Sequence, residues 1–166
     1  MPSKILFIVA SVLIVATPTS AYAQTAEECE GAVSTREIVN CKSAELQEKR
    51  EILDTYLQEA FKVTREEEWL DSERIIAHLK ESQEQWEKSI ENYCDALYVR
   101  WIEGTIREPY RLACMKAMYT RRTHKLWTNF IRVHPQFTYS SSLDEPERPT
   151  PNDTLPDEPI KGVSEE

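Results

Sequence analysis

The feature that most constrains the fold of this chain is a pair of cysteines at equal distances on either side of a glycine. Cys94 lies ten residues before Gly104, and Cys114 lies ten residues after it. The segment before the glycine carries residues at alternating spacings of four and three, which puts them on one stripe of a helix; they are Leu79, Gln83, Trp86, Ile90, Tyr93 and Leu97. If the chain folds back at Gly104 as an antiparallel hairpin, the sulfurs lie level across helices about 8–10 Å apart. We therefore expect a disulfide between Cys94 and Cys114.

A helix before this hairpin is predicted by a capping box. Ser34 can accept a hydrogen bond from the amide of Glu37, whose carboxylate reaches back to the amide of Ser34. Apolar residues then recur at helical spacing from about residue 35 to the mid-60s. The next helix has two possible starts, an N-cap at Thr64 or one near Asp71, and we favour the later start.

The remaining boundaries follow from the turn and from prolines. The second helix is expected to run to about Glu103, and Pro109 fits the first turn of the third helix. Pro135 should end that helix. Because no strand-like alternation is visible, the fold class expected is all-α, an antiparallel three-helix up-down bundle.

The first 23 residues predict a secretory signal peptide. Lys4 precedes an apolar run from Ile5 to Ala16, and Ala21 and Ala23 flank a small-x-small cleavage site. A membrane-spanning helix needs about 20 predominantly apolar residues, and Pro18 interrupts the run before that length. We expect an exported protein, periplasmic or extracellular, with no stable membrane insertion after cleavage.

Four cysteines in an exported chain favour two disulfides. Cys29 can fold back onto Cys41, because an extended lead of five residues spans about 16 Å while seven helical residues rise about 10 Å. Loop geometry alone does not exclude the other two pairings. Zinc ligation is disfavoured, since no two cysteines are two to four residues apart.

Composition changes at the end of the chain. Residues 138–166 hold five prolines, eight acids and two bases, with almost no large apolar side chains. Such a segment cannot bury enough surface to offset its ordering entropy, so a disordered Pro-rich acidic tail is expected after a helical domain of residues 24–137. Loss of residues 1–23 would change the formal charge from −9 to −10, which repels nucleic acid and attracts cationic partners.

The residue spacing resembles the secreted LprI family of lysozyme inhibitors. The residues that carry this resemblance are Cys29, Thr35, Cys41, Leu53, Tyr56, Gln83, Trp86, Cys94, Gly104, Cys114, Arg122 and Leu126. It implies a disulfide-stapled helical domain in which Gln83, Trp86, Gly104 and Arg122 are structural motif residues. The chain departs from the family pattern at three positions, with Asp54 for asparagine, Ile90 for arginine and Tyr119 for threonine. Because no cysteine follows the expected cleavage site, we expect no lipid attachment.

No catalytic residue, metal site or cofactor is predicted. His78, His124 and His134 are scattered without paired-ligand spacing, and three glycines are too few for a phosphate-binding loop. We therefore expect a non-enzymatic protein.

By resemblance, its partner would be a protein, a cationic lysozyme-type enzyme. Candidate contacts lie around the hairpin turn, at Glu103, Thr105 and Glu108, where a stapled turn could be presented to a cleft. The alternative is a structural or scaffolding module of the cell envelope whose acidic tail binds a partner.

Overall fold

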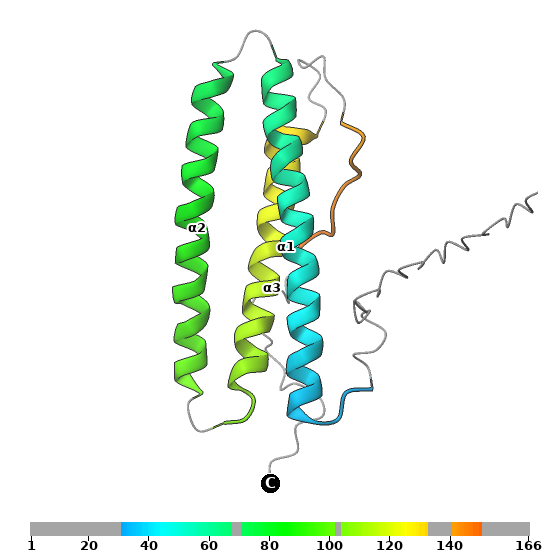
Figure 1. The fold of residues 1–166 in the computed structure, drawn as a ribbon, viewed down its shortest axis with the longest axis vertical. Coiled ribbons are helices and arrows are strands. Elements are labelled where there is room, and N and C mark those ends of the chain that lie inside the picture. Colours follow the sequence, from blue (N-terminus) through cyan, green and yellow to red (C-terminus); the bar gives the residue numbers. More distant parts are fainter. Residues whose placement is uncertain (1–30, 68–70, 102–103, 133–140, 151–166) are drawn as a thin grey trace, which may run out of the picture.

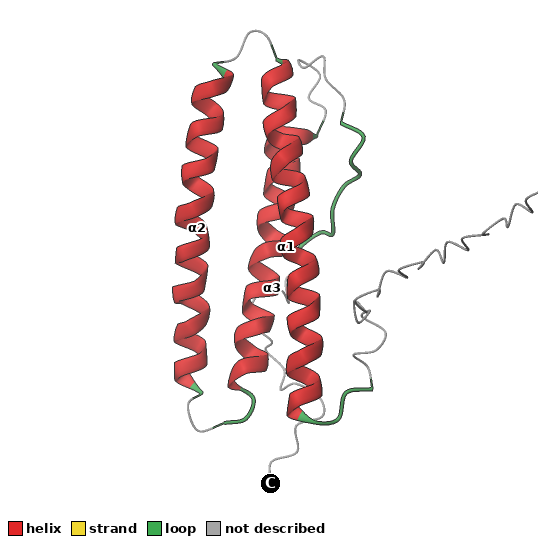
Figure 2. Cartoon of the chain, viewed as in Figure 1, coloured by secondary structure: helices red, strands yellow, loops and turns green. Residues whose placement is uncertain are grey.

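The computed structural model describes residues 31–67, 71–101, 104–132 and 141–150. Its helices are α1 (Thr35–Glu66), α2 (Ser72–Arg100) and α3 (Arg107–Leu126), with the π-helical turn η2 (Trp127–Ile131) continuing α3. The described ranges contain helix and loop and no strand (Figure 2). The all-α prediction is therefore confirmed for this part of the chain.

The three helices lie along one long axis, with α2 antiparallel to α1 and α3 (Figure 1). α1 and α3 pack on each other most extensively, α2 packs chiefly on α3, and α1 meets α2 least. The bundle is thus a close α1–α3 pair with α2 attached through α3. None of the helices in the described ranges has a stretch long and apolar enough to cross a bilayer.

The predicted capping box begins α1. The amide of Glu37 donates to Ser34 Oγ at 3.3 Å, and Glu37 Oε2 accepts from the amides of Ser34 at 2.9 Å and Val33 at 3.1 Å. The bonds to Ser34, and then the one to Val33, lower the pKa of the Glu37 carboxyl. These bonds satisfy amides that would otherwise be unpaired at a helix start.

The later start predicted for the second helix is confirmed. α2 begins at Ser72, directly after Asp71. Thr64 is instead buried inside α1, where its hydroxyl donates to the carbonyl of Ala60 at 2.7 Å. A threonine bonded back into its own helix cannot cap the next one.

The core draws apolar side chains from all three helices. Its large fully or nearly buried members include Leu46, Leu53, Phe61, Ile76, Leu79, Ile90, Leu112, Met115 and Leu126. Two aromatic side chains are exceptions: Tyr93, a member of the predicted stripe, is 49% exposed, and Trp101 is 41% exposed. Cys94 takes the inward position beside Tyr93, and Trp101 lies past the last turn of α2, stacked on Tyr110 at 5.4 Å between ring centroids.

The hairpin disulfide is confirmed. Cys94 and Cys114 are bonded, their Cα atoms are 5.7 Å apart, and both side chains are buried. No described cysteine is a free thiol, but Cys29 lies outside the described residues, so the pairing of Cys29 with Cys41 stays a prediction. α2 ends at Arg100, earlier than the predicted end at Glu103, which also lies outside the described residues.

Disorder of the predicted tail, residues 138–166, is not shown, and residues 141–150 make defined contacts with the bundle. This segment, here called the strap, runs beside α1 on the side away from α2 (Figure 1). Tyr56 Oη donates to the carbonyl of Asp144 at 2.8 Å, and Lys49 pairs with Glu147 at 2.9 Å. The expectation of disorder rested on the small number of apolar side chains in this segment. The strap is instead held by ion pairs and hydrogen bonds. The rest of the predicted tail, the signal peptide at 1–23, Pro135 and His134 lie outside the described residues.

Replacing Cys94 and Cys114 together by alanine should lower the free energy of unfolding by about 2–4 kcal/mol, because the unfolded chain regains the freedom of the closed loop. Urea unfolding of the oxidised proteins, followed by circular dichroism, measures the difference. The exposed α2 variant Asn92→Ala is the control and should change stability little. A loss below about 1 kcal/mol would contradict a stabilising role for this bond.

Candidate functional site

A polar junction ties the middle of α2 to α3. Arg122 Nε donates to Gln83 Oε1 at 3.0 Å, and Arg122 Nη2 donates to Ser82 Oγ at 3.1 Å. The Arg122 guanidinium also lies 5.5 Å from the centroid of the Trp86 ring. Gln83 is buried and in turn donates from Nε2 to Glu87 at 2.9 Å. The structure thus brings together Gln83, Trp86 and Arg122, three of the four predicted motif residues, and gives them a role in joining helices.

Tyr119 extends this junction to α1. Its ring meets the Trp86 ring edge-on at 5.2 Å, and the Arg50 guanidinium of α1 lies 5.5 Å from its centroid. Burial raises the pKa of the Tyr119 phenol, and the charge of Arg50 opposes this rise. Burial lowers the pKa of the Arg122 guanidinium, and the negative charge of Glu87 opposes this change. Aromatic and cationic side chains from all three helices therefore meet at one level of the bundle.

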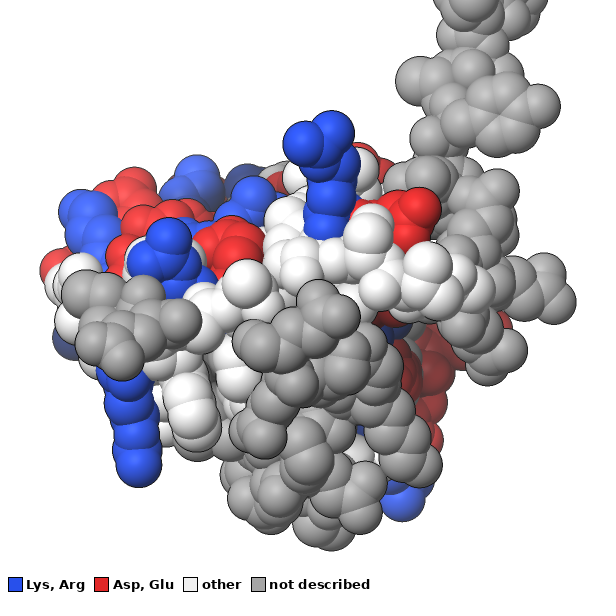
Figure 3. All heavy atoms as spheres, turned by 90° about the horizontal axis from the view of Figure 1, so that it is seen from below, with Lys and Arg blue, Asp and Glu red and all other residues white. Residues whose placement is uncertain are grey.

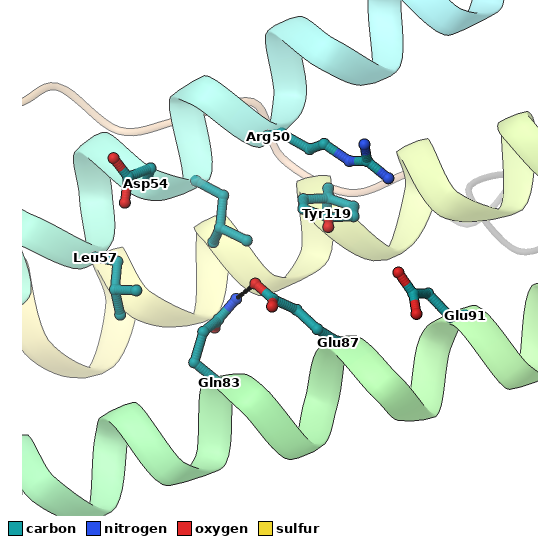
Figure 4. A pocket seen from close by; sticks show the side chains of 8 residues that line it. Arg50, Asp54, Leu57, Gln83, Glu87, Glu91 and Tyr119 are labelled. Atoms are coloured by element: carbon teal, nitrogen blue, oxygen red, sulfur yellow. Dashed lines mark hydrogen bonds between the residues drawn. The ribbon is translucent and has the colours of Figure 1, made fainter.

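A cavity of about 320 Å³ opens between α1 and α2 (Figure 4). Its lining is Arg50, Leu53, Asp54 and Leu57 from α1, Gln83, Glu87 and Glu91 from α2, and Tyr119 from α3. Three carboxylates and one guanidinium thus border a space with two leucine side chains in its wall. A lysine or arginine side chain has the matching chemistry, an apolar stem and a cationic head.

Sequence reasoning missed this cavity. Its residues belong to three helices, and the periodicity of each helix alone indicates only a buried stripe and a solvated face. The one available signal was Asp54, a carboxylate at a position where the family resemblance predicts asparagine.

A second hollow, of about 440 Å³, lies at the hairpin end of the bundle. Its lining is Thr35, Val39, Tyr98, Gly104, Thr105, Arg107 and Glu108. Two of the predicted contacts, Thr105 and Glu108, are therefore together there, whereas Glu103 lies outside the described residues. Glu108 also lies 3.6 Å from Arg111. Seen from this end, uncharged atoms occupy the middle of the described surface, with charged side chains of both signs around them (Figure 3).

Gly104 shapes the turn beside this hollow. Its amide donates to the carbonyl of Trp101 at 3.0 Å, and a Cβ added at residue 104 would lie 3.3 Å from Ile106 Cγ1. A larger residue would therefore have to displace the Ile106 side chain.

Within the described ranges, no three histidine, cysteine or acidic side chains are grouped to hold a metal ion.

Comparison with known protein families identifies one match. The model of the family described as lysozyme inhibitor LprI matches residues 26–126 of the 166-residue chain. The chain belongs to the LprI lysozyme inhibitor family. The region that matches the LprI family includes all of α1 and α2, the Cys94–Cys114 bond and the Arg122 junction. No curated protein and no solved structure matches the chain.

Two departures from the LprI pattern are accounted for by packing. Ile90, at the position of an arginine in the family pattern, is 4% exposed in the core. Tyr119, at the position of a threonine, is buried against Trp86 and Arg50. Both changes add buried nonpolar surface.

Removing Arg122 from the junction should destabilise the fold. Arg122→Met leaves Gln83 Oε1 without its donor, which costs about 1–3 kcal/mol of unfolding free energy. In a double-mutant cycle with Gln83→Met, the two losses should be less than additive because the residues share one bond. Urea unfolding gives the four free energies, and Arg121→Met is the control. Strict additivity would contradict the coupling.

Tyr119 should make stability depend on alkaline pH. Its pKa is raised in the folded protein, so its contribution is fully present below the unfolded value of about 10 and is lost as the pH rises through the folded value. Tyr119→Phe removes the ionising group, so its unfolding free energy should fall less steeply above about pH 10. Unfolding curves for both proteins across that range provide the measurement, and parallel pH profiles would contradict the assignment.

Proposed function

We propose that this chain is an exported, non-enzymatic binding protein that inhibits a lysozyme-type enzyme. The observation that carries the proposal is the LprI family match over residues 26–126, which covers most of the helical bundle. Export rests on the predicted signal peptide and on the oxidised Cys94–Cys114 bond, a bond typical of oxidising compartments. A stapled, well-packed bundle also suits an inhibitor, because a rigid surface loses little conformational entropy on binding.

The distribution of charge bears on where a cationic enzyme would bind. α3 carries one acidic residue, Glu108, and six basic ones, Arg107, Arg111, Lys116, Arg121, Arg122 and Lys125. Acids are more frequent on α2, which has six acidic and four Lys or Arg residues. We therefore favour the α1–α2 side over the exposed side of α3.

Two surfaces are candidates for the contact. The α1–α2 cavity offers Asp54, Glu87 and Glu91 to a basic side chain of the enzyme. The hairpin end offers Thr105 and Glu108 beside a hollow that a protruding loop could enter. Charge favours the cavity, since Glu108 already has Arg111 as a neighbour.

Purified mature protein should slow the lysis of bacterial cell walls by lysozyme in a turbidity assay. Inhibition should rise with protein concentration and saturate, as expected for a specific complex. Unchanged lysis at a large excess of folded protein would remove the proposal for the enzyme tested.

Two sets of variants distinguish the surfaces. Asp54→Asn with Glu91→Gln should weaken inhibition about tenfold or more if the cavity receives a basic side chain, because one lost interfacial ion pair costs on the order of 1–2 kcal/mol. Thr105→Ala with Glu108→Gln should then leave inhibition unchanged. Glu84→Gln, an exposed acid elsewhere on α2, is the matched control. The opposite pattern would assign the contact to the hairpin end.

A further inference from the structure

The strap meets α1 in register. Ser141 Oγ donates to Glu59 at 2.9 Å, Tyr56 donates to the Asp144 carbonyl at 2.8 Å, and Lys49 pairs with Glu147 at 2.9 Å. The three strap residues are spaced three apart, and their partners on α1 follow in the opposite order along the chain. The strap therefore runs antiparallel to α1.

The spacing of the last two contacts matches chain geometry. From Tyr56 to Lys49, seven helical residues rise about 10 Å. From Asp144 to Glu147, three extended residues cover about 10 Å. An extended peptide can thus follow this face of α1 without strain between the two contacts.

α3 contributes a further contact to the same face. His124 Nε2 is buried without a hydrogen-bond partner, and it lies 3.5 Å from Glu145 Oε1. Arg148, within the strap, bonds the same carboxylate at 2.6 Å. A buried imidazole nitrogen is thus directed at an acid of the strap.

These contacts are polar and mostly near solvent. Leu143 is the only large apolar side chain of the strap, and it is half-buried. Exposed ion pairs stabilise by about 0–1 kcal/mol each, and salt screens them. The strap therefore stays in place mainly because it is tethered, which gives it a millimolar effective concentration.

We propose that Lys49, Tyr56, Glu59 and His124 form a binding site for an extended acidic peptide, and that the strap is its reversible intramolecular occupant. While the strap is bound, Glu147 is paired with Lys49, and Glu145 lies beside His124. Release of the strap separates both carboxylates from these partners and empties the site. This inference concerns a face of α1 different from the one that lines the cavity, and it does not depend on lysozyme inhibition.

A charge exchange in the full-length protein tests the proposal. Lys49→Glu and Glu147→Lys should each raise the equilibrium ratio of released to bound strap about three- to fivefold at low salt, measured from the NMR chemical shifts of residues 141–150. The double variant, which restores opposite charges, should return this ratio to within about twofold of wild type. The exposed substitutions Glu48→Lys and Lys88→Glu control for net charge and should leave the ratio unchanged.

Tyr56→Phe gives a second, uncharged test. It removes the bond to the Asp144 carbonyl and should raise the ratio of released to bound strap at both low and high salt, whereas the effect of Lys49→Glu should shrink as salt rises. The ratio in the wild-type protein should not change on dilution.

Three results would overturn the proposal. An unchanged ratio in both Lys49→Glu and Tyr56→Phe would show that the strap is not held at this site. Failure of the double charge reversal to restore the wild-type ratio would show that the pair is not the recognised contact. A lower proportion of released strap at higher protein concentration would show that the occupant comes from a second copy.

Discussion

The attachment of α2 to α3 is the constraint on which the rest of this structure depends. α2 has little direct packing on α1, and it is held to α3 by several interactions, among them the Cys94–Cys114 bond, the junction of Arg122 with Gln83 and the Arg111–Asp95 ion pair. Because α2 is held through α3, a cavity remains between α1 and α2. The position of one helix thus shapes both the core and this acidic cavity.

Local features of this fold could be predicted from the sequence, and long-range ones could not. The Ser34 capping box and the level cysteines of the hairpin depend on short spacings, and both are present. Trp101 is partly exposed and lies just past the end of α2 at Arg100, and helical periodicity does not specify where a helix ends. The bond between Tyr56 and Asp144 joins residues 88 positions apart, so composition alone gave no sign of it. The π-helical turn after α3 likewise had no signal in the pattern.

The candidate site shows the same division. Family resemblance singled out Gln83, Trp86 and Arg122 before their contacts were known, and the contacts give these residues a structural role. The cavity lining could not be predicted from the sequence, because its residues come from three helices whose relative positions the helical pattern does not specify. The acidic charge is unevenly distributed over the chain. α3 is basic, whereas acidic side chains lie beside the cavity and in the strap. An LprI-type inhibitor with this charge distribution would offer carboxylates to a cationic partner at the cavity and in the strap, and not over its whole surface.

Hydrogen exchange along α2 in the Arg122→Met variant, with the disulfide intact, tests the central claim most directly. Loss of the junction should speed exchange of α2 amides around Gln83 and Trp86, while amides next to Cys94 and those of α1 stay protected. That local pattern would show that the Arg122 junction holds the middle of α2 to α3. Unchanged exchange around Gln83, or an equal increase in all three helices, would contradict it.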